Sequence, residues 1–419
     1  MLEIRSAARL SRPPDVMPTS LISITEARRR VLDATRPLGT EPVALDDALG
    51  RILAQDVAAA GDVPPFPCSA MDGYAVLAGG AGRTLRVVGE SRAGTPSGHE
   101  LAEGEAIRIS TGAAIPPRAT AVIPQENVDR NGDSEILTNA VSAPGEHIRE
   151  AGEDMRAQTI VLRAGTVLGP IALGAAAAAG VGSVIASRRP RVSVLCTGDE
   201  LRAPGEPLGP GEIHNSNAPM LTGLAQRAGA LTAPAERLPD DRHASTEGIR
   251  AALARSDVVI ISGGVSVGPH DHVKPALDAL GVGEVFWSVA LQPGKPTWFG
   301  VPAAGRPLVF GLPGNPVSAV VTFSLFVAPA LAALQGGPSP EPPRASALLG
   351  VDVARNPRRE QMIRVRLTDE GDGVRAYPNR GQASHILTSL LGADALALIP
   401  AGEGEWPAGA TVALHALAG

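Results

Sequence analysis

Aromatic side chains are scarce in this chain of 419 residues. Phe, Trp and Tyr make up 3% of the sequence, whereas hydrophobic residues as a whole make up 44%. The cores must therefore be built mainly from Ala, Val, Leu and Ile. A charged fraction of only 19% excludes a chain that is disordered throughout. The length corresponds to roughly two to four domains of ordinary size.

Cysteine and positive charge are also in short supply. The two cysteines, Cys68 and Cys196, cannot form a disulfide framework, and they favour a cytoplasmic, reducing compartment. The chain has 37 basic and 43 acidic residues, a net charge of −6. Without a basic excess to neutralise a phosphate backbone, we expect no nucleic-acid partner. The N-terminal arginines are not followed by a long apolar run, which argues against a secretory signal.

One uncharged stretch, residues 165–187, leaves two interpretations open. It consists largely of Ala and Gly and contains Pro170. Such residues insert into bilayers more weakly than Leu or Phe. A buried helix followed by a strand is favoured over a membrane span, and we expect no membrane partner.

The sequence changes character several times along its length. A capping box at Ser23–Glu26 opens one helix, and a second helix is expected over 45–54. Short alternating runs then indicate strands, and strand–loop–helix repeats follow. The fold class predicted is α/β and multidomain: a three-layer α/β domain with a mostly parallel sheet, a helical and extended linking domain, an inserted mostly-β domain and a C-terminal β-barrel. The expected boundaries are a disordered extension (1–20), the linking and dimerisation domain (21–67 and 146–187), the inserted domain (68–145), the α/β domain (188–336) and the barrel (344–419).

Three loops of the α/β domain are candidates for chemistry. Apolar strands at 192–195, 258–261 and 307–310 each run into a loop, and ligands of parallel sheets bind beyond these strand ends. Glycines in such loops let backbone N–H groups approach an anion, which suits a phosphate-bearing ligand. The loop acids would then require a hard cation such as Mg²⁺. These acids are Asp199, Glu200 and Asp271.

Each of these signals has a plainer interpretation. Glycine-rich loops after strands are often only turns, and the loops here lack both the Walker A lysine and the dinucleotide-binding glycine pattern. Asp72–Gly73 is compatible with a simple turn, and Arg364 with Arg366 is compatible with a solvated strand face. Residues 380–385 could hold an oxyanion or form a polar turn. A His-x-His metal site around Asp271 has no third ligand indicated.

Taken together, the motifs are identified as those of a known family. They resemble the molybdopterin molybdenumtransferases, the family that also contains the gephyrin E domain. The resemblance covers residues 21–419. It rests on SAMDGYA (69–75), TG (111–112), PQE (124–126), GED (152–154), TGDEL (197–201), SGGVSVG (262–268), PGKP (293–296) and GLPGNPVS (311–318).

The resemblance implies a homodimer whose site lies between the α/β domain of one subunit and the β-rich second domain of the other. The implied substrate is adenylylated molybdopterin. Molybdate and Mg²⁺ are implied to promote cleavage of its phosphoanhydride, with release of AMP and insertion of molybdenum. The molybdopterin adenylyltransferase that acts upstream is a further implied partner. Two alternatives stay open, namely an adenylyltransferase activity and a non-catalytic scaffold of the same fold.

Carried over residue by residue, the resemblance assigns roles to acids and to a binding set. The implied catalytic residues are Asp72, Asp154, Glu200 and Asp271, and the implied metal ligands are Glu200, Asp240 and Asp271. Substrate binding is implied for Thr111, Gly198, Gly263, Gly264, Ser266, Gly268, Lys295, Pro313, Gly314, Asn315, Pro316, Arg364, Arg380 and Ser384.

The sequence departs from the family pattern at two positions. Ser288 and Gln292 stand where family members commonly carry lysines. A lost charge-assisted contact can weaken anion binding by about 1–3 kcal/mol. Lys274 or Lys295 could compensate. The intact acids at 72, 154, 200 and 271 argue against a degenerate scaffold.

Overall fold

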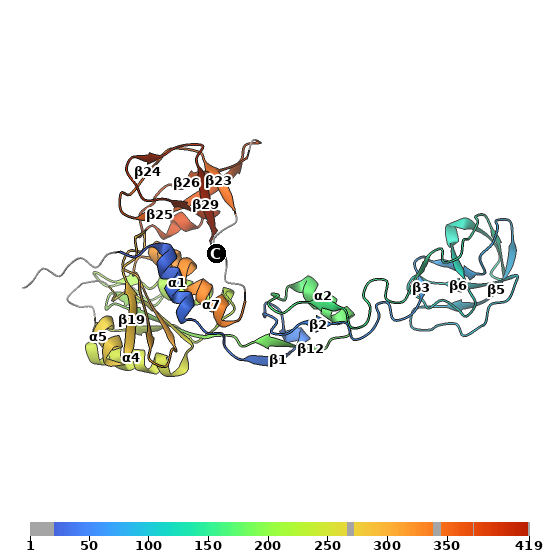
Figure 1. Ribbon diagram of the computed structural model, residues 1–419, viewed down its shortest axis with the longest axis horizontal. Helices are drawn as coiled ribbons and strands as arrows, with labels where there is room; N and C mark the ends of the chain where they lie inside the picture. Colours follow the sequence, from blue (N-terminus) through green and yellow to red (C-terminus); the bar gives the residue numbers. More distant parts are fainter. Residues whose placement is uncertain (1–20, 266–271, 338–344, 372, 418–419) are drawn as a thin grey trace, which may run out of the picture. The chain divides into compact units, whose positions relative to one another are not determined.

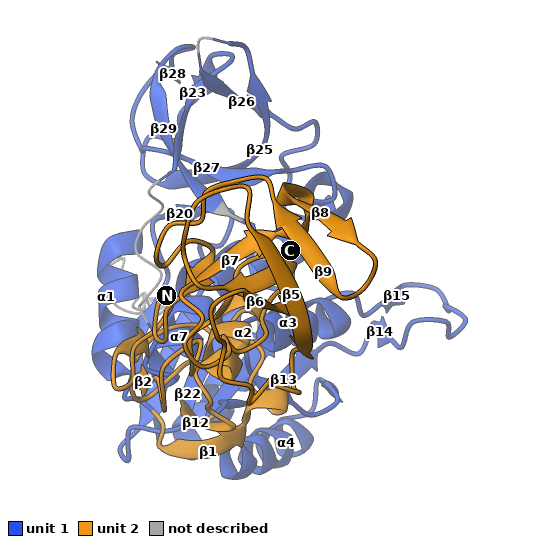
Figure 2. Ribbon diagram, turned by 90° about the vertical axis from the view of Figure 1, so that its right-hand side faces the viewer, with its two compact units in different colours: residues 1–37, 189–419 blue, residues 38–188 orange. Residues whose placement is uncertain are grey.

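The computed structural model describes residues 21–265, 272–337, 345–371 and 373–417. The predicted extension 1–20 and the site candidates Ser266, Gly268 and Asp271 therefore lie outside the described residues. The chain forms two compact units, coloured separately in Figure 2. Unit 1 comprises residues 1–37 and 189–419, and unit 2 comprises residues 38–188.

Unit 1 contains a seven-stranded sheet that is mostly parallel. Its central strands pair in parallel, and near one edge a single reversed strand, Trp298–Pro302, pairs antiparallel with both of its neighbours. Residues 258–262 and 308–312 are buried throughout, as expected of strands covered on both faces. Along the sheet the order is β16 (Leu231–Thr232), β13 (Arg191–Thr197), β18 (Val258–Ser262), β22 (Leu308–Leu312), β21 (Trp298–Pro302) and β19 (Val282–Trp287), with β17 (Glu236–Leu238) also on β13.

Helices cover both faces of this sheet and complete three layers (Figure 1). Helices α4 (Arg242–Arg255) and α5 (Val273–Ala279) pack together on one face. The other face carries α1 (Ile24–Ala34), α3 (Asn217–Arg227) and the continuous helix formed by α6 (Pro316–Thr322), the π-helical η3 (Phe323–Val327) and α7 (Ala328–Leu334). The predicted α/β fold is confirmed. The span Pro316–Leu334 is long and apolar enough to cross a membrane, but 78% of it is buried inside the protein, as in a core helix.

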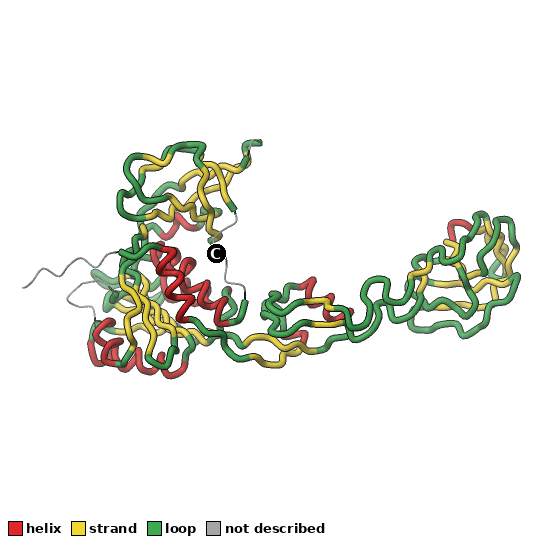
Figure 3. Tube along the Cα trace, in the orientation of Figure 1, coloured by secondary structure: helices red, strands yellow, loops and turns green. Residues whose placement is uncertain are grey.

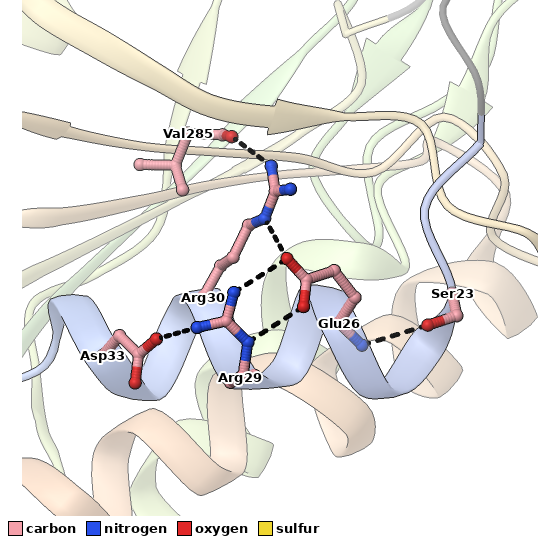
Figure 4. A network of polar contacts seen from close by, with 6 residues as sticks. All are labelled: Ser23, Glu26, Arg29, Arg30, Asp33 and Val285. Atoms are coloured by element: carbon pink, nitrogen blue, oxygen red, sulfur yellow. Dashed lines mark hydrogen bonds and ion pairs between the residues drawn. The ribbon is translucent and has the colours of Figure 1, made fainter.

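Helix α1 begins at the predicted cap, but only half of the capping box forms. The Ser23 hydroxyl accepts from the Glu26 backbone N–H at 3.1 Å. The Glu26 carboxylate instead accepts from the guanidinium groups of Arg29 and Arg30 (Figure 4). These two arginines, Arg29 first, lower the pKa of Glu26 to about 2. Arg30 also donates to the Val285 carbonyl at 3.3 Å, so the network ties α1 to β19.

The C-terminal region of unit 1 is a closed barrel, as predicted. Five strands close on themselves because β25 pairs with both β26 and β27. A short strand from the α/β region, β20 (Leu291–Gln292), adds to β25 in parallel. The barrel interior is made of Ala, Val, Leu and Ile. In order around the barrel the strands are β25 (Glu360–Asp369), β26 (Val374–Pro378), β23 (Ser346–Leu349), β29 (Thr411–Ala416) and β27 (Ala395–Ile399), and β24 (Val353–Ala354) pairs with β28 (Glu405–Trp406) outside it.

Unit 2 consists mainly of strands and loops (Figure 3). Its largest element is a six-stranded sheet in the order β7 (Ala121–Pro124), β4 (Gly73–Val76), β6 (Glu105–Ile109), β5 (Thr84–Ser91), β9 (Glu135–Thr138) and β8 (Val128–Asn131). Three two-stranded pairs lie outside this sheet: β1 (Thr40–Ala44) with β12 (Ser183–Ser187), β2 (Val57–Ala58) with β11 (Ile160–Leu162), and β3 (Cys68–Ser69) with β10 (Ile148–Arg149).

Two local predictions in unit 2 were wrong. The expected helix over 45–54 is a single 3₁₀ turn, Leu45–Asp47, after which Gly50 adopts a φ of +73° and Leu53 bridges to Ala186. The stretch 165–187 forms helix α2 (Pro170–Ala178) and strand β12, but the helix is not buried, since Ile171 is 90% exposed. The helix over 45–54 does not form because Leu53 instead pairs with Ala186, which is distant in sequence.

Candidate functional site

A cavity of about 590 Å³ lies at the carboxyl edge of the parallel strands in unit 1. This is the edge at which ligands of open α/β sheets bind. The walls come from the ends of β13, β18 and β22, from the start of α3, and from the barrel. The lining residues are Cys196, Thr197, Glu200, Leu201, Ile213, His214, Asn215, Ser216, Asn217, Ser262, Gly314, Asn315, Pro316, His385 and Leu387.

Strand register brings the three predicted loops together. Cys196 of β13 lies opposite Ser262 of β18, and Ser262 lies opposite Leu312 of β22. The loops that follow these residues therefore leave the sheet at one level. The starts of the three predicted loops, at residues 197, 262 and 311, therefore lie at one edge of the sheet.

The loop after β18 needs its glycines. Gly263 has a φ of +91°, and a Cβ atom built there would lie 2.6 Å from the Thr197 hydroxyl oxygen. Gly264 has a φ of +64°, and its Cβ would lie 2.6 Å from a Val273 methyl group. Both positions combine left-handed backbone with close approach, which only glycine tolerates without strain. Gly314 faces the same loop, because its Cβ would lie 3.9 Å from Gly263 Cα.

Sequence reasoning missed a polar cluster at the start of α3. Asn217 is buried and donates through Nδ2 to the Ser262 hydroxyl at 2.8 Å and to the Gly314 carbonyl at 2.7 Å. Asn215 accepts from the Ala218 backbone N–H at 3.0 Å and so caps the helix. The available signal was the polar run His214–Asn217 directly before an amphipathic helix.

Cys196 lies on the cavity wall as a neutral thiol. Burial raises its pKa to about 11, against a smaller opposing effect of a hydrogen bond with Asn215. A protonated thiol is a poor nucleophile at neutral pH. Cys68 is also buried, and both cysteines are free.

Two of the predicted metal ligands, Glu200 and Asp240, belong to an acidic group beside the cavity. The carboxylate oxygens of Asp199 and Asp240 each accept from the other residue's backbone N–H, at 3.3 and 3.4 Å. Glu200 is exposed and lines the cavity. Within the described residues, no group of three His, Cys, Asp or Glu side chains is arranged to hold a metal ion.

The barrel supplies the other wall of the cavity. Asn315 donates through Nδ2 to the Ser384 hydroxyl at 3.0 Å, so two predicted binding residues meet. Pro313 is buried, and its carbonyl lies 3.5 Å from the Ser262 hydroxyl, while Pro316 starts α6.

Other predicted cations take different positions. Arg364 is 1% exposed, and burial lowers the pKa of its guanidinium below the usual range. That guanidinium donates to the carbonyls of Gly381 and Ala383 and to the Ser389 hydroxyl. The expectation of a solvated strand face is therefore wrong for Arg364, while Arg366 is exposed as expected. Lys295 and Arg380 are exposed and are not among the residues that line the cavity.

The two departures from the family pattern occupy defined positions. Ser288 is buried and has a φ of +71°. The Gln292 side-chain oxygen Oε1 accepts from Asn356 Nδ2 at 2.7 Å. Lys274 stacks its ammonium 3.4 Å from the centre of the Trp287 ring, a cation–π contact.

Unit 2 holds a separate group of predicted site residues. Asp72 Oδ1 accepts from the Thr111 backbone N–H at 2.7 Å and from the Thr111 hydroxyl at 3.1 Å. Both residues are exposed. Asp154 lies on another segment, where its backbone N–H donates to the Val63 carbonyl at 3.0 Å. The structure thus joins Asp72 to Thr111 within this unit.

Comparison with known proteins covers almost the whole chain. Three family models match: the MoeA N-terminal region (domain I and II) at 22–180, the probable molybdopterin binding domain at 193–333, and the MoeA C-terminal region (domain IV) at 346–417.

Curated relatives and a solved structure point to the same family as the three family models. The molybdopterin molybdenumtransferase of Haemophilus influenzae is 36% identical over 402 residues, which cover 94% of this chain and 98% of that protein. Molybdopterin molybdenumtransferase 2 of Mycobacterium tuberculosis H37Rv is 38% identical over 92% of this chain and 97% of its own. The structure of the molybdopterin biosynthesis MoeA protein from Pyrococcus horikoshii OT3 has a TM-score of 0.77 and 32% identity, covering 95% of this chain and 100% of that one. This chain therefore belongs to the molybdopterin molybdenumtransferase family.

Proposed function

We infer that the protein is a transferase that delivers molybdenum to molybdopterin in the biosynthesis of the molybdenum cofactor. The observation that carries this inference is the match to curated molybdopterin molybdenumtransferases over nearly the full length of both chains. We propose that the pterin substrate binds in the cavity at the carboxyl edge of the sheet, whose lining residues come mostly from the segment matched by the molybdopterin binding domain.

The finer reaction is a proposal. The substrate is adenylylated molybdopterin, and cleavage of its phosphoanhydride releases AMP as molybdate is inserted. Such a cleavage needs charge neutralised on the leaving phosphate. The cavity is lined by Thr197 and Ser262, whose hydroxyls suit phosphate oxygens, and by Gly314. The glycines at 263 and 264 directly follow Ser262.

Magnesium fits the acids of this site. Glu200 and Asp240, with Asp271 as a third ligand outside the described residues, would hold the ion. Mg²⁺ is commonly bound by one or two carboxylates and completes its shell with water and substrate phosphates, which is compatible with an incomplete protein shell. When bound, it would supply charge neutralisation on the phosphates. Glu200 and Asp240 would then hold the ion beside the cavity.

We propose roles for the other predicted site residues from where each lies in the structure. Asp72 and Asp154 of unit 2 are proposed as catalytic acids, with Thr111 holding the Asp72 carboxylate in one orientation. The Asn315–Ser384 pair is proposed to contact the substrate directly. Exposed Lys295 and Arg380 are proposed to attract the molybdate oxyanion. The compartment proposed is the cytoplasm, which is compatible with two free thiols.

A homodimer is part of the proposal. The linking region of unit 2 exposes several large apolar side chains, and exposed apolar surface of this kind marks protein–protein interfaces. They are Leu49, Ile160, Val167 and Ile171. We expect Ile171→Glu to shift the protein towards monomer in sedimentation velocity. An unchanged distribution would remove this surface as the interface. An association with the adenylyltransferase that produces the substrate is also proposed.

AMP release from adenylylated molybdopterin, with Mg²⁺ and with or without molybdate, tests the function directly. Molybdate-stimulated release is expected, and Glu200→Gln should reduce it strongly. Glu247→Gln, which alters an exposed acid on α4, is the matched control and should leave the rate unchanged. Substrate binding without turnover would instead support a scaffold, and absence of binding would contradict the proposal.

A further inference from the structure

Asn217 connects two of the loops that line the cavity. Its side chain is 8% exposed and stands at the first position of α3. Nδ2 donates to the Ser262 hydroxyl at the end of β18 and to the Gly314 carbonyl after β22, at 2.8 and 2.7 Å. One amide therefore sets the spacing between two segments that are 52 residues apart (262 to 314).

The chemistry of the partners dictates how this amide is oriented. A carbonyl oxygen can only accept, so the NH₂ group must face Gly314. Oδ1 is buried and has no hydrogen-bond partner in the described part of the chain. Both hydrogen bonds of this side chain are therefore made by Nδ2 to the two loops, while its buried oxygen has no partner among the described residues.

A second buried amide provides an internal comparison at the far end of α3. Gln335, which caps α7, is 4% exposed and donates through Nε2 to the carbonyls of Ala228 and Leu331, at 2.9 and 3.0 Å. Ala228 is the C-cap of α3. Asn217 and Gln335 thus make the same kind of bond at opposite ends of this helix, but only Asn217 lines the cavity.

We propose that Asn217 is a positioning residue for molybdenum transfer, which holds Ser262 and Gly314 at the spacing that the bound substrate requires. The inference rests on the proposed function. Misplacing a binding group by about 1 Å can lower a rate about 100-fold, even where the fold survives. The effect of Asn217 on the reaction should therefore exceed its effect on stability.

The experiment compares Asn217→Ala with Gln335→Ala in the full-length protein. Both variants lose an amide that donates twice, so both should unfold at a temperature lower by a few degrees. Only Asn217→Ala should lower kcat/KM for AMP release, by about 10- to 100-fold. An equal loss of kcat/KM in the two variants, or an unchanged value in Asn217→Ala, would overturn the inference.

Asn217→Asp supplies a second readout. The ionised carboxylate cannot donate to the Gly314 carbonyl, whereas the protonated acid can. The activity of this variant relative to the wild type should therefore rise as the pH is lowered, and a pH-independent ratio would contradict the inference.

Failure of the proposed function is distinguishable from failure of this inference. If the wild type releases no AMP, the function fails. The inference is then tested by the affinity of the same variants for adenylylated molybdopterin in a direct binding measurement. Asn217→Ala should bind about 10-fold more weakly than Gln335→Ala, and equal affinities would reject it.

Discussion

The Asn315 amide donates to the Ser384 hydroxyl at 3.0 Å, and the two residues are 69 positions apart in the chain. The Val317 backbone N–H also donates to the Ser384 carbonyl, at 3.1 Å. These bonds attach the first turn of α6 to the loop that follows β26 of the barrel. The wall of the cavity is consequently shared by two domains of unit 1.

Removing the Ser384 hydroxyl should affect function more than folding. In Ser384→Ala the backbone bond to Val317 stays, so the free energy of unfolding should fall by at most about 1 kcal/mol. The freed Asn315 amide should lower kcat/KM for AMP release several-fold. Ser324→Ala, which removes a hydroxyl bonded within the helix, should leave kcat/KM unchanged. If both variants behave alike, Ser384 has no role at the site.

Gly263→Ala should destabilise the protein through both strain and crowding. The left-handed backbone contributes about 1–2 kcal/mol, and the Cβ contact with the Thr197 hydroxyl adds about 1–3 kcal/mol. Gly281→Ala is the matched control, because its φ is +73° but nothing lies within 4 Å of its Cβ. Chemical denaturation should show a clearly larger loss for position 263. Equal losses of unfolding free energy would mean that the Thr197 side chain moves away from the new Cβ atom at little cost.

Arg364→Met should be strongly destabilising, unlike Arg366→Met two residues away. The first change leaves the Gly381 and Ala383 carbonyls and the Ser389 hydroxyl without their buried charged donor. A loss of about 2–4 kcal/mol is expected. Exposed Arg366 should contribute within about 0.5 kcal/mol. Urea unfolding measures both, and a small effect at position 364 would show that the loop is held in another way.

Acid should weaken unit 1 through His415. Partial burial on the outer face of β29, with a smaller contribution from Arg28, lowers the pKa of His415 to about 4, from an ordinary value of 6.5. As the pH falls from 6.5 towards 4, His415 is protonated in the unfolded chain but stays neutral in the folded chain. The free energy of unfolding therefore decreases across this pH range. Above pH 6.5 the effect vanishes. His415→Gln should flatten this part of the stability profile, while exposed His243→Gln should retain it.

Replacing Asp72 of unit 2 should lower the rate of AMP release without changing the stability of the protein. Asp72 is exposed and bonded only to Thr111 through its side chain among the described residues, so Asp72→Ala should change stability by about 0.5 kcal/mol or less. AMP release should fall by about 100-fold or more if Asp72 acts as proposed. Thr111→Val keeps the backbone donor and should show a smaller loss. A fully active Asp72→Ala would remove this residue from the catalytic set.

Local patterns predicted those features that depend on neighbours in sequence. The apolar runs before residues 197, 262 and 311 became adjacent buried strands, because apolar segments between helices are covered on both faces. The N-cap at Ser23 also formed as predicted. Prediction was wrong over 45–54, where pairing of Leu53 with Ala186 outweighed local helix propensity.

Side-chain environments could not be predicted in this way. Arg364 and Arg366 lie on the same face of β25, opposite the barrel interior that Ile363 and Val365 enter. The sequence alone does not say that residues 381–389 cover Arg364 and leave Arg366 exposed. Asn217 carries no motif of its own, and its two partners are 45 and 97 residues away.

The sequence by itself determined the family, the strand–loop–helix order and the chemical types available to the site, since these depend on residue identity and on spacing within short segments. Tertiary structure alone decided which groups meet: Asn315 with Ser384, Asn217 with Ser262 and Gly314, Asp72 with Thr111. The physical reason is that hydrogen bonds and burial act over a few ångströms in space. Only strand register and domain packing bring distant parts of the chain within that range.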